Sequence, residues 1–214
     1  MENQYIDISL PLRSDFPVWP GDPPAVIKQV STIRNGDGDN SSRIQSSLHW
    51  GTHVDAPYHI VEKGWTIDRI PLDVLIGPVK VIEIANVREI TATHLKSFKI
   101  KQCKRLLVKT RNSAFWDESP LRFHHDFTAF SKDAAEYLLD CGVRLIGVDY
   151  LSLDLFTATD LPVHHLLYEQ NVIGLEGLDL RKVSPGSYQL FCLPLNIMDG
   201  DGAPARVILT KNEL

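Results

Sequence analysis

The chain has 214 residues, of which 43% are hydrophobic, and its formal net charge is -5. This length can bury one complete hydrophobic core, so we expect one domain that spans residues 1–214. The acidic balance and the lack of a basic run argue against nucleic acid as a partner, because phosphates require a positively charged face. No apolar run approaches membrane-spanning length and the first residues show no export signal, so we expect no membrane partner and a cytoplasmic location.

Short apolar runs and helical patterns alternate along the chain, without an internal repeat. The predicted strands, most of them rich in Val, Ile and Leu, are residues 5–10, 80–84, 105–109, 143–148, 172–176, 188–193 and 206–209. Helical patterns occur at 91–98, 131–141 and 162–170. This alternation predicts an α/β or α+β fold, in which a single domain has a mixed, barrel-like β-sheet core that is flanked by helices.

The segment 131–141 gives the clearest helix signal. Ser131 is a suitable N-cap, alanine and leucine residues form an apolar stripe, and Gly142 follows as a stop signal. By contrast, the Asn-, Asp- and Gly-rich segment 34–40 predicts a flexible loop tip. Its acidic residues resemble a calcium-binding loop, but the Glu that closes such a loop is absent.

Two further features of the composition give expectations. The most basic stretch, residues 96–109, is expected on a solvated face. The three cysteines are odd in number, far apart and in apolar settings, and we expect buried thiols in a reducing compartment rather than disulfides. They are Cys103, Cys141 and Cys192.

The most informative stretch is Ser-Leu-His-Trp-Gly-Thr-His-Val-Asp-Ala-Pro-Tyr-His, residues 47–59, which holds three imidazoles and a carboxylate. Its Gly, Pro and β-branched residues argue against a helix, so we interpret it as a strand end that runs into a loop. Imidazole nitrogen and carboxylate oxygen are ligands that zinc, manganese and iron favour. The cluster therefore predicts a metal or catalytic site. It consists of His49, His53, Asp55 and His59.

Further ligands are expected from the segment 162–178. It contains the adjacent pair His164 and His165 on a predicted short helix, and one histidine of this pair is expected to be a ligand because neighbours on a helix point about 100° apart. Glu176 lies inside an apolar strand, where a buried carboxylate needs a cation, a metal or hydrogen-bond donors. An outward-facing position for Glu176 stays open, because side chains alternate along a strand.

Such a donor set suits hydrolysis by activated water. A divalent ion lowers the pKa of water that it binds from about 16 toward 7, and it can polarise a carbonyl group. His59 has an ordinary pKa near neutrality and could carry the proton to the leaving group. A serine nucleophile is not required, and the chain lacks the Gly-x-Ser-x-Gly elbow.

These motifs resemble those of the cyclase-like metal-dependent hydrolases, the family that includes bacterial kynurenine formamidase. The most specific one is the His-x-Gly-Thr-His-x-Asp core within 48–59, joined by Phe-Pro-Val-Trp-Pro-Gly-Asp-Pro at 16–23 and by the segment 164–178. The resemblance covers nearly the whole chain and extends through 123–127, 142–149 and 193–204.

The resemblance implies a role for each site residue. His49, His53 and Asp55 would hold one metal ion, and Asp55 and Glu176 would bridge to a second ion that His164 completes, with His165 as the alternative. His59 resembles the proton donor and acceptor of the family. Trp19 resembles the aromatic residue that contacts the substrate, although covering the core is an alternative for it. Zinc is the expected metal, as one or two ions, and manganese stays open.

The same resemblance implies an activity and an assembly. We expect hydrolysis of N-formylkynurenine to kynurenine and formate, a step of tryptophan catabolism, by a homodimer or homotetramer whose partner is this small-molecule substrate. Hydrolysis of a cyclic amide or lactone such as isatin is the alternative activity, and a non-catalytic metal- or ligand-binding module is the alternative class. The roles of His124, His125 and Asp149 are left open.

Overall fold

The structure is a computed structural model that describes residues 5–211. Its strands are β1 (Tyr5–Asp7), β2 (Val26–Ser31), β3 (Ser41–Gln45), β4 (His53–Asp55), β5 (Ile76–Ile84), β6 (Glu89–Ile90), β7 (Arg105–Thr110), β8 (Ala129–Phe130), β9 (Leu145–Val148), β10 (Ile173–Glu176), β11 (Gly186–Pro194) and β12 (Gly202–Thr210). Its α-helices are α1 (Leu72–Leu75), α2 (Ala92–Lys96), α3 (Lys132–Asp140) and α4 (Pro162–Tyr168). The 3₁₀ turns are η1 (Ile33–Asn35), η2 (Pro57–His59), η3 (Ile67–Arg69) and η4 (Arg111–Asp117).

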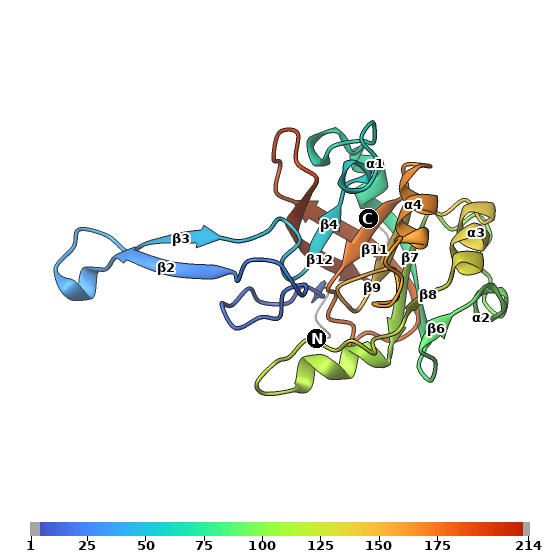
Figure 1. Ribbon diagram of the computed structural model, residues 1–214, viewed down its shortest axis with the longest axis horizontal. Coiled ribbons are helices and arrows are strands. Elements are labelled where there is room, and N and C mark those ends of the chain that lie inside the picture. Colours follow the sequence, from blue (N-terminus) through green and yellow to red (C-terminus); the bar gives the residue numbers. More distant parts are fainter. Residues whose placement is uncertain (1–4, 212–214) are drawn as a thin grey trace.

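A closed β-barrel forms the centre of the described chain (Figure 1). The strands follow the order β12-β11-β5-β7-β9-β10-β4, and β4 pairs back to β12 to close the ring. Neighbours are parallel from β5 through β7 and β9 to β10, and antiparallel elsewhere. β1 continues the edge of β12 beyond β4. This mixed barrel confirms the predicted fold class.

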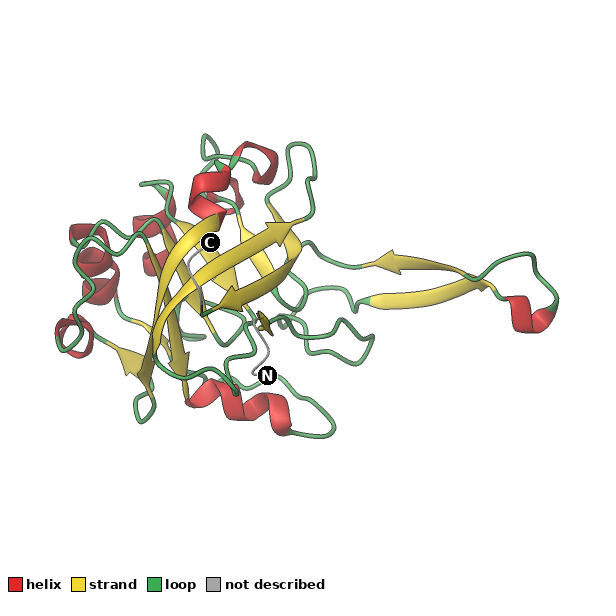
Figure 2. Ribbon diagram, turned by 180° about the vertical axis from the view of Figure 1, so that it is seen from behind, coloured by secondary structure: helices red, strands yellow, loops and turns green. Residues whose placement is uncertain are grey.

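The barrel strands supply two cores, because side chains alternate between the two faces of a strand. On β7, Leu107 packs inside the barrel, whereas Leu106 and Val108 pack on the outside. Helices α2, α3 and α4 cover that outer face, as Figures 1 and 2 show from opposite sides. The parallel strands are therefore buried on both faces, which explains why they are continuous apolar runs in the sequence.

The predicted helices are present, with slightly different ends. The Ser131 side chain accepts a hydrogen bond from the Ala134 N–H and begins α3, and Gly142, with φ +78°, follows its end. Thr91 caps α2, and α4 begins with Pro162 at its first turn. Among residues 5–211, no helix has both the length and the apolar character that crossing a membrane requires.

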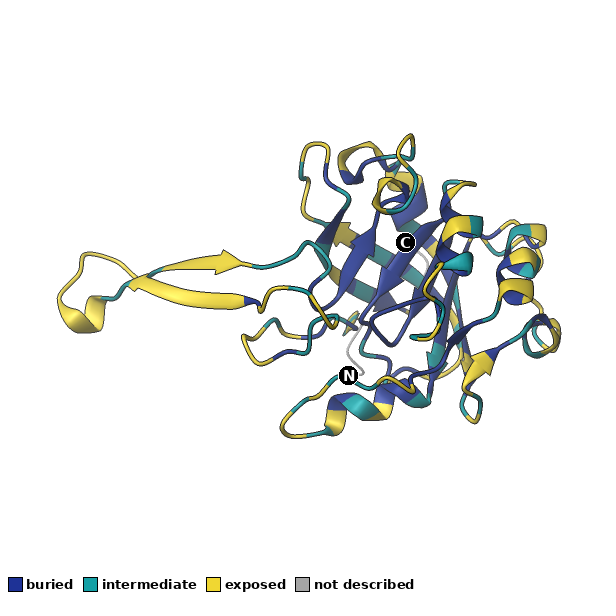
Figure 3. Ribbon diagram, viewed as in Figure 1, coloured by how far each residue is buried: buried dark blue, intermediate teal, exposed yellow. Residues whose placement is uncertain are grey.

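Two parts of the structure differ from expectation. The loop tip at 34–40 is the end of a hairpin arm, formed by β2 and β3, that projects from the barrel and is exposed on both faces (Figure 3). The basic stretch is not wholly solvated, because Arg105 is buried beneath the turn between α1 and β5. Its guanidinium donates to the carbonyl groups of Asp73, Val74, Ile76 and Pro78.

Candidate active site and metal centre

The site lies on β4, the strand that closes the barrel. His53 and Asp55 are two residues apart on β4 and therefore face the same side. Strand β10 pairs with β4 so that Glu176 lies opposite His53. Barrel closure thus brings a carboxylate that is more than 100 residues away in sequence next to the histidine core.

Glycines flank Asp55 on both neighbouring strands. Gly174 on β10 and Gly202 on β12 both lie opposite it. A Cβ atom at Gly174 would collide with the hydroxyl of Tyr168, and one at Gly202 would lie 2.8 Å from Cε1 of His49. The missing side chains therefore make room for the groups that surround the Asp55 carboxylate.

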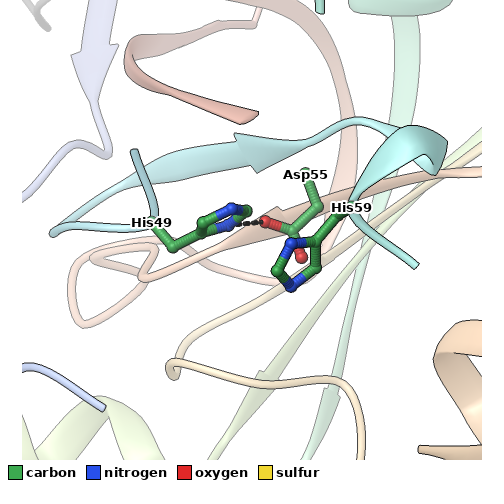
Figure 4. Close-up of side chains that lie close together, drawn as sticks. All are labelled: His49, Asp55 and His59. Atoms are coloured by element: carbon green, nitrogen blue, oxygen red, sulfur yellow. Dashed lines mark hydrogen bonds and ion pairs between the residues drawn. The ribbon is translucent and has the colours of Figure 1, made fainter. Parts of the chain in front are cut away.

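The five predicted metal ligands converge around Asp55. Nδ1 of His49 lies 2.6 Å from Asp55 Oδ1, and Nε2 of His53 lies 3.2 Å from the same oxygen. Glu176 lies 3.6 Å from His53 through Oε2 and 3.4 Å from Nε2 of His164 through Oε1. The ligand atoms form two groups that could each hold an ion and that share Asp55. They are His49, Asp55 and His59 (Figure 4), and His53, Asp55 and Glu176.

Each imidazole in the cluster is oriented by a partner on its other nitrogen. Nδ1 of His53 lies 3.0 Å from the Gly51 carbonyl oxygen, and Nδ1 of His164 lies 2.6 Å from Asp154 Oδ2. Nε2 of His49 lies 2.7 Å from Asp201 Oδ2. Histidines that bind metals typically donate their second N–H to such acceptors, which leaves the first nitrogen free for the ion. The donor set therefore fits a metal centre.

The two carboxylates are also held in place. The Tyr168 hydroxyl donates to Asp55 Oδ2 at 2.8 Å, and the backbone N–H of Leu153 donates to Glu176 Oε1 at 3.0 Å. Asp55 and Glu176 are both buried. Glu176 thus faces the cluster, and its outward-facing alternative is wrong.

The electrostatics of the cluster call for positive charge. Burial disfavours the charged form of His49, but Asp55 and Asp201 outweigh burial and raise the pKa of His49 to about 10. Burial likewise opposes charge on His164, yet Asp154 and Glu176 raise its pKa to about 10. Without an ion, the carboxylates are compensated by protons on imidazoles. A divalent cation would supply the same compensation, which is a second reason why the residues fit a metal.

The cluster opens on one side into a cavity of about 360 Å³. Trp19 lines this cavity and packs against Phe123 and Phe156, with ring centroids 5.3 and 5.5 Å apart. His59 also lines the cavity, with its ring centroid 4.0 Å from that of His49. Trp19 therefore lies on the cavity wall, where the predicted contact with a substrate requires it to be.

His59 combines contact with the cluster and access to the cavity. Its Nδ1 lies 3.6 Å from Asp201 Oδ2. Burial lowers the pKa of His59, and the charge of His49 adds to this effect although Asp55 opposes it. A lowered pKa keeps this imidazole neutral at pH 7, the form that can accept a proton.

The other candidate residues lie outside the cluster. His165 is exposed and points toward Glu169, so of the histidine pair it is His164 that faces the site. The ring of His124 stacks on Phe115, and that of His125 lies against Phe156. Asp149 is buried and accepts hydrogen bonds from Thr110 and Ser113. This gives Asp149 a structural position under the η4 turn.

Three residues around the ligands were not identified from the sequence. Asp154 caps α4 by accepting hydrogen bonds from the N–H groups of Val163 and His164. Tyr168 and Asp201 had no signal beyond their places in the helix 162–170 and in the Asp-Gly-Asp-Gly stretch. Their contribution depends on strand pairing, which brings these distant segments to Asp55 and His49.

Comparison with known proteins agrees with this geometry. Residues 6–155 match the family model described as "Putative cyclase". The kynurenine formamidase of Geobacillus thermodenitrificans is 37% identical over 211 residues, which are 99% of each chain. A solved structure named "The Structure Of Potential Metal-Dependent Hydrolase With Cyclase Activity" is 35% identical, with a TM-score of 0.84 and 98% of both chains covered. Isatin hydrolase A from Labrenzia aggregata, bound to benzyl benzoate, is 24% identical, with a TM-score of 0.81 over 98% of this chain and 94% of its own; that likeness shows the fold.

The fold and the site define a β-barrel protein of the metal-dependent hydrolase class. The chain belongs to the cyclase family. The resemblance inferred from the sequence and the assignment to the hydrolases are thereby confirmed.

Proposed function

We propose that the protein hydrolyses an aryl formamide, most specifically N-formylkynurenine to kynurenine and formate. The observation that carries this proposal is the cluster around Asp55, which opens into a cavity between an aromatic wall at Trp19 and a neutral imidazole at His59. The relatives named kynurenine formamidase, at 33 to 37% identity over nearly the whole chain, support the substrate class.

The residues that would hold one or two divalent ions, zinc by preference, share Asp55 at their centre. They are His49, His53, Asp55, His164 and Glu176, whereas His59, whose ring nitrogen also lies close to His49 and Asp55, is assigned to proton transfer. A bound ion would supply water activated at neutral pH and would polarise the formyl carbonyl group. The donor atoms are preorganised for metal binding, because each of these imidazoles and both carboxylates already have an orienting hydrogen bond.

His59 is the proton carrier of this proposal. With Nδ1 directed to Asp201, its Nε2 is the nitrogen that takes a proton from the attacking water and returns it to the leaving aryl nitrogen. The C–N bond of the formamide breaks, the water oxygen becomes part of formate, and the amine leaves neutral. Asp201 Oδ2 lies 2.7 Å from Nε2 of His49, which it orients, and 3.6 Å from Nδ1 of His59.

The cavity suits a small aromatic substrate. Its volume is at the lower end of the range of ligand pockets, about 300 to 1,000 Å³. The T-shaped contact of Trp19 with Phe123 and its tilted contact with Phe156 leave an apolar wall for an aryl ring. Asp22 lines the cavity on the Trp19 side and lies apart from the Asp55 cluster, where it could bind the ammonium group of an amino acid substrate.

The decisive experiment combines metal analysis of the purified protein with turnover of N-formylkynurenine, formanilide and isatin. One to two equivalents of metal, with efficient turnover of N-formylkynurenine that a chelator abolishes and the metal restores, would support the proposal. Bound metal with turnover of isatin only would indicate that the substrate is a lactam rather than a formamide. A protein without metal under metal-replete conditions would contradict the proposed centre.

The cellular location is part of the same proposal. The three cysteines are unpaired thiols, and Cys141 and Cys192 are buried, whereas Cys103 is only partly so. Free thiols support a reducing compartment such as the cytoplasm. Fractionation of cells followed by detection of the protein would check the location, and a count of three thiols after isolation under air-free conditions would check that the cysteines are reduced.

A further inference from the structure

Asp149 is a fully buried carboxylate that the proposed chemistry does not use. Its two oxygens accept four hydrogen bonds, from the N–H and hydroxyl groups of Thr110 and of Ser113, at 2.6 to 3.0 Å. All four donors are uncharged, although a buried carboxylate normally pairs with a cation. A polar group that breaks this rule inside a core marks a position where the surrounding geometry matters.

The donors of Asp149 belong to a firmly held part of the fold. Thr110 ends β7, and Ser113 lies in the η4 turn that follows it. Asn112 of the same turn exchanges two hydrogen bonds with the backbone of Thr128, at 2.7 and 2.8 Å. All of these residues are buried. Asp149, which comes directly after β9, thus joins the end of that strand to a turn that is itself fixed at both ends.

The segment 150–154 follows Asp149 and is buried, yet it belongs to no helix or strand. The polar groups of a buried backbone need partners, so this segment is held by individual hydrogen bonds rather than by a strand ladder. The Tyr150 carbonyl accepts from the Gly177 N–H at 2.8 Å, and the Leu153 carbonyl accepts from the Phe130 N–H at 2.9 Å. The Asp149 side chain supplies the anchor at the start of the segment.

The end of this segment orients two groups of the candidate metal centre. The Leu153 N–H donates to Glu176 Oε1 at 3.0 Å. One residue later, Asp154 Oδ2 lies 2.6 Å from Nδ1 of His164 and fixes the orientation of that ring. Glu176 and His164 lie 3.4 Å apart, so a displacement of the segment would move both members of this pair.

We infer that Asp149 is a positioning residue for His164 and Glu176, and that it acts through the segment 150–154. The carboxylate fixes where the segment begins, and the segment presents the Leu153 N–H and the Asp154 carboxylate to the two candidate ligands. Asp149 itself does not line the cavity. The consequence for metal binding rests on the proposed centre, whereas the effect on the His164 ring does not.

This role depends on the shape of the Asp149 side chain rather than on its charge. Burial raises the pKa of Asp149, and the hydrogen bonds from Ser113 and Thr110 oppose this shift. Asparagine has the same shape. Its oxygen can replace Oδ2, which accepts three of the four hydrogen bonds, and its amide can donate to the Thr110 hydroxyl oxygen. Asp149→Asn should therefore keep the segment in place, whereas Asp149→Ala should release it.

The first test uses nuclear magnetic resonance on the metal-free protein with isotope-labelled histidine. The Nδ1–H of His164 is expected as a downfield proton resonance that exchanges slowly with water, and His164→Gln assigns it by its loss. Asp149→Ala should shift this resonance and speed its exchange, because a segment without its anchor opens more often. Asp149→Asn should leave it as in the wild type. An asparagine variant that behaves like the alanine variant would overturn the positioning role.

A milder variant keeps the test decisive if the alanine variant does not fold, since Asp149→Ala leaves four donors without an acceptor. Ser113→Ala removes only the hydroxyl that donates to Asp149 at 2.6 Å, and it should shift the His164 resonance in the same direction. Thr91→Ala is the matched control. It removes the hydroxyl that caps α2, and it should lower the melting temperature without moving the resonance.

The second test measures zinc affinity by competition with a chromophoric chelator, at a temperature where the compared variants are folded. Asp149→Ala is expected to bind zinc about tenfold more weakly, the lower end of what loss of an outer partner costs, and Ser113→Ala less so. Thr91→Ala should bind like the wild type, and an equal loss in this control would overturn the inference. An unchanged His164 resonance in Ser113→Ala and in a folded Asp149→Ala would also overturn it. A wild type that binds no zinc would contradict the proposed centre and leave the resonance test to decide on Asp149.

Discussion

Gly174 on β10 lies directly opposite Asp55 on β4, and the hydroxyl of Tyr168 occupies the space that its missing side chain leaves. The hydrogen bond from Tyr168 orients the carboxylate that both groups of ligand atoms share. A glycine is therefore needed here for the geometry of a polar site, although the strand around it is an ordinary apolar run.

We expect Gly174→Ala to displace Tyr168 and to lower the free energy of unfolding by about 1–3 kcal/mol, as overpacking does elsewhere. Turnover should fall as well, because the Asp55 carboxylate loses its donor. Thermal unfolding and kcat measure the two effects. Gly186→Ala is the control, because a Cβ there would lie at an ordinary 3.5 Å from its nearest neighbour.

The same prediction can be separated into its two parts. Tyr168→Phe removes the hydroxyl that the new methyl group meets, so in that background the Gly174→Ala change should cost clearly less stability. Equal costs in both backgrounds would show that the collision with Tyr168 is not the cause.

For His59→Ala, we expect metal content near that of the wild type and a kcat lowered by about 10²-fold or more, the usual size of general acid–base effects. His165→Ala, which changes an exposed histidine of the same chain, should leave both quantities unchanged. Metal analysis and steady-state kinetics on the two variants give the answer. Unchanged turnover of His59→Ala would remove this residue from the mechanism.

Asp201 should control how tightly the site holds its metal, because it accepts the hydrogen bond from His49 Nε2 at 2.7 Å. Loss of such a partner typically weakens metal binding by about 10- to 100-fold, which we expect for Asp201→Ala. Asp201→Asn keeps an acceptor oxygen and should recover much of this loss. Competition with a chromophoric chelator measures the affinities of the metal-free variants.

The neighbour Asp199 provides the control for Asp201. It is exposed, and at φ +55° it has a backbone conformation that asparagine also adopts readily. Asp199→Asn should therefore bind metal like the wild type. If Asp201→Ala binds metal as tightly as Asp199→Asn, then Asp201 does not support His49.

Asp22 should distinguish an amino acid substrate from a simple formamide. If it pairs with the substrate ammonium group, Asp22→Asn would lower kcat/KM for N-formylkynurenine by about tenfold, which corresponds to 1.4 kcal/mol. The kcat/KM for formanilide, which has no ammonium group, should not change. An equal fall of kcat/KM on both substrates would show that Asp22 maintains the shape of the cavity and does not bind the ammonium group.

Metal binding should release protons at pH 7. In the metal-free protein, the pKa of His164 is raised to about 10, so this imidazole is protonated at pH 7 and must lose its proton to become a ligand. Protons compete with the ion, and the affinity is therefore expected to fall as the pH is lowered. Calorimetric titration in two buffers of different ionisation enthalpy counts the protons, and a count of zero would contradict the raised pKa.

The parts of this protein that could be predicted from its sequence are those with a local cause. The parallel strands are buried on both faces and so are continuous apolar runs, and α3 has both its cap and its stop signal in the sequence. The five candidate ligands could be proposed from the sequence because three of them are clustered along the chain and Glu176 is out of place in an apolar strand.

The parts that were missed depend on long-range pairing. β4, with its three residues, was expected only as a strand end within residues 47–59, whereas β2 and β3 were missed because neither face of the arm packs against the barrel and the two strands lack apolar alternation. Arg105 is buried because carbonyl groups of a turn 30 residues earlier in the chain surround its guanidinium. The local sequence around these residues contains no pattern from which such long-range contacts could be predicted.

The short strand β4 has a consequence for how the protein folds. It closes the barrel by pairing with both β10 and β12, and the same three residues include two of the candidate ligands, His53 and Asp55. Until this strand is inserted, Glu176 has no histidine opposite it, and no partly folded chain with an open ring can form the complete donor set. The ion would thus bind tightly only after β4 has closed the barrel, and the amount of tightly held metal in a preparation would measure the fraction of chains with a correctly closed barrel.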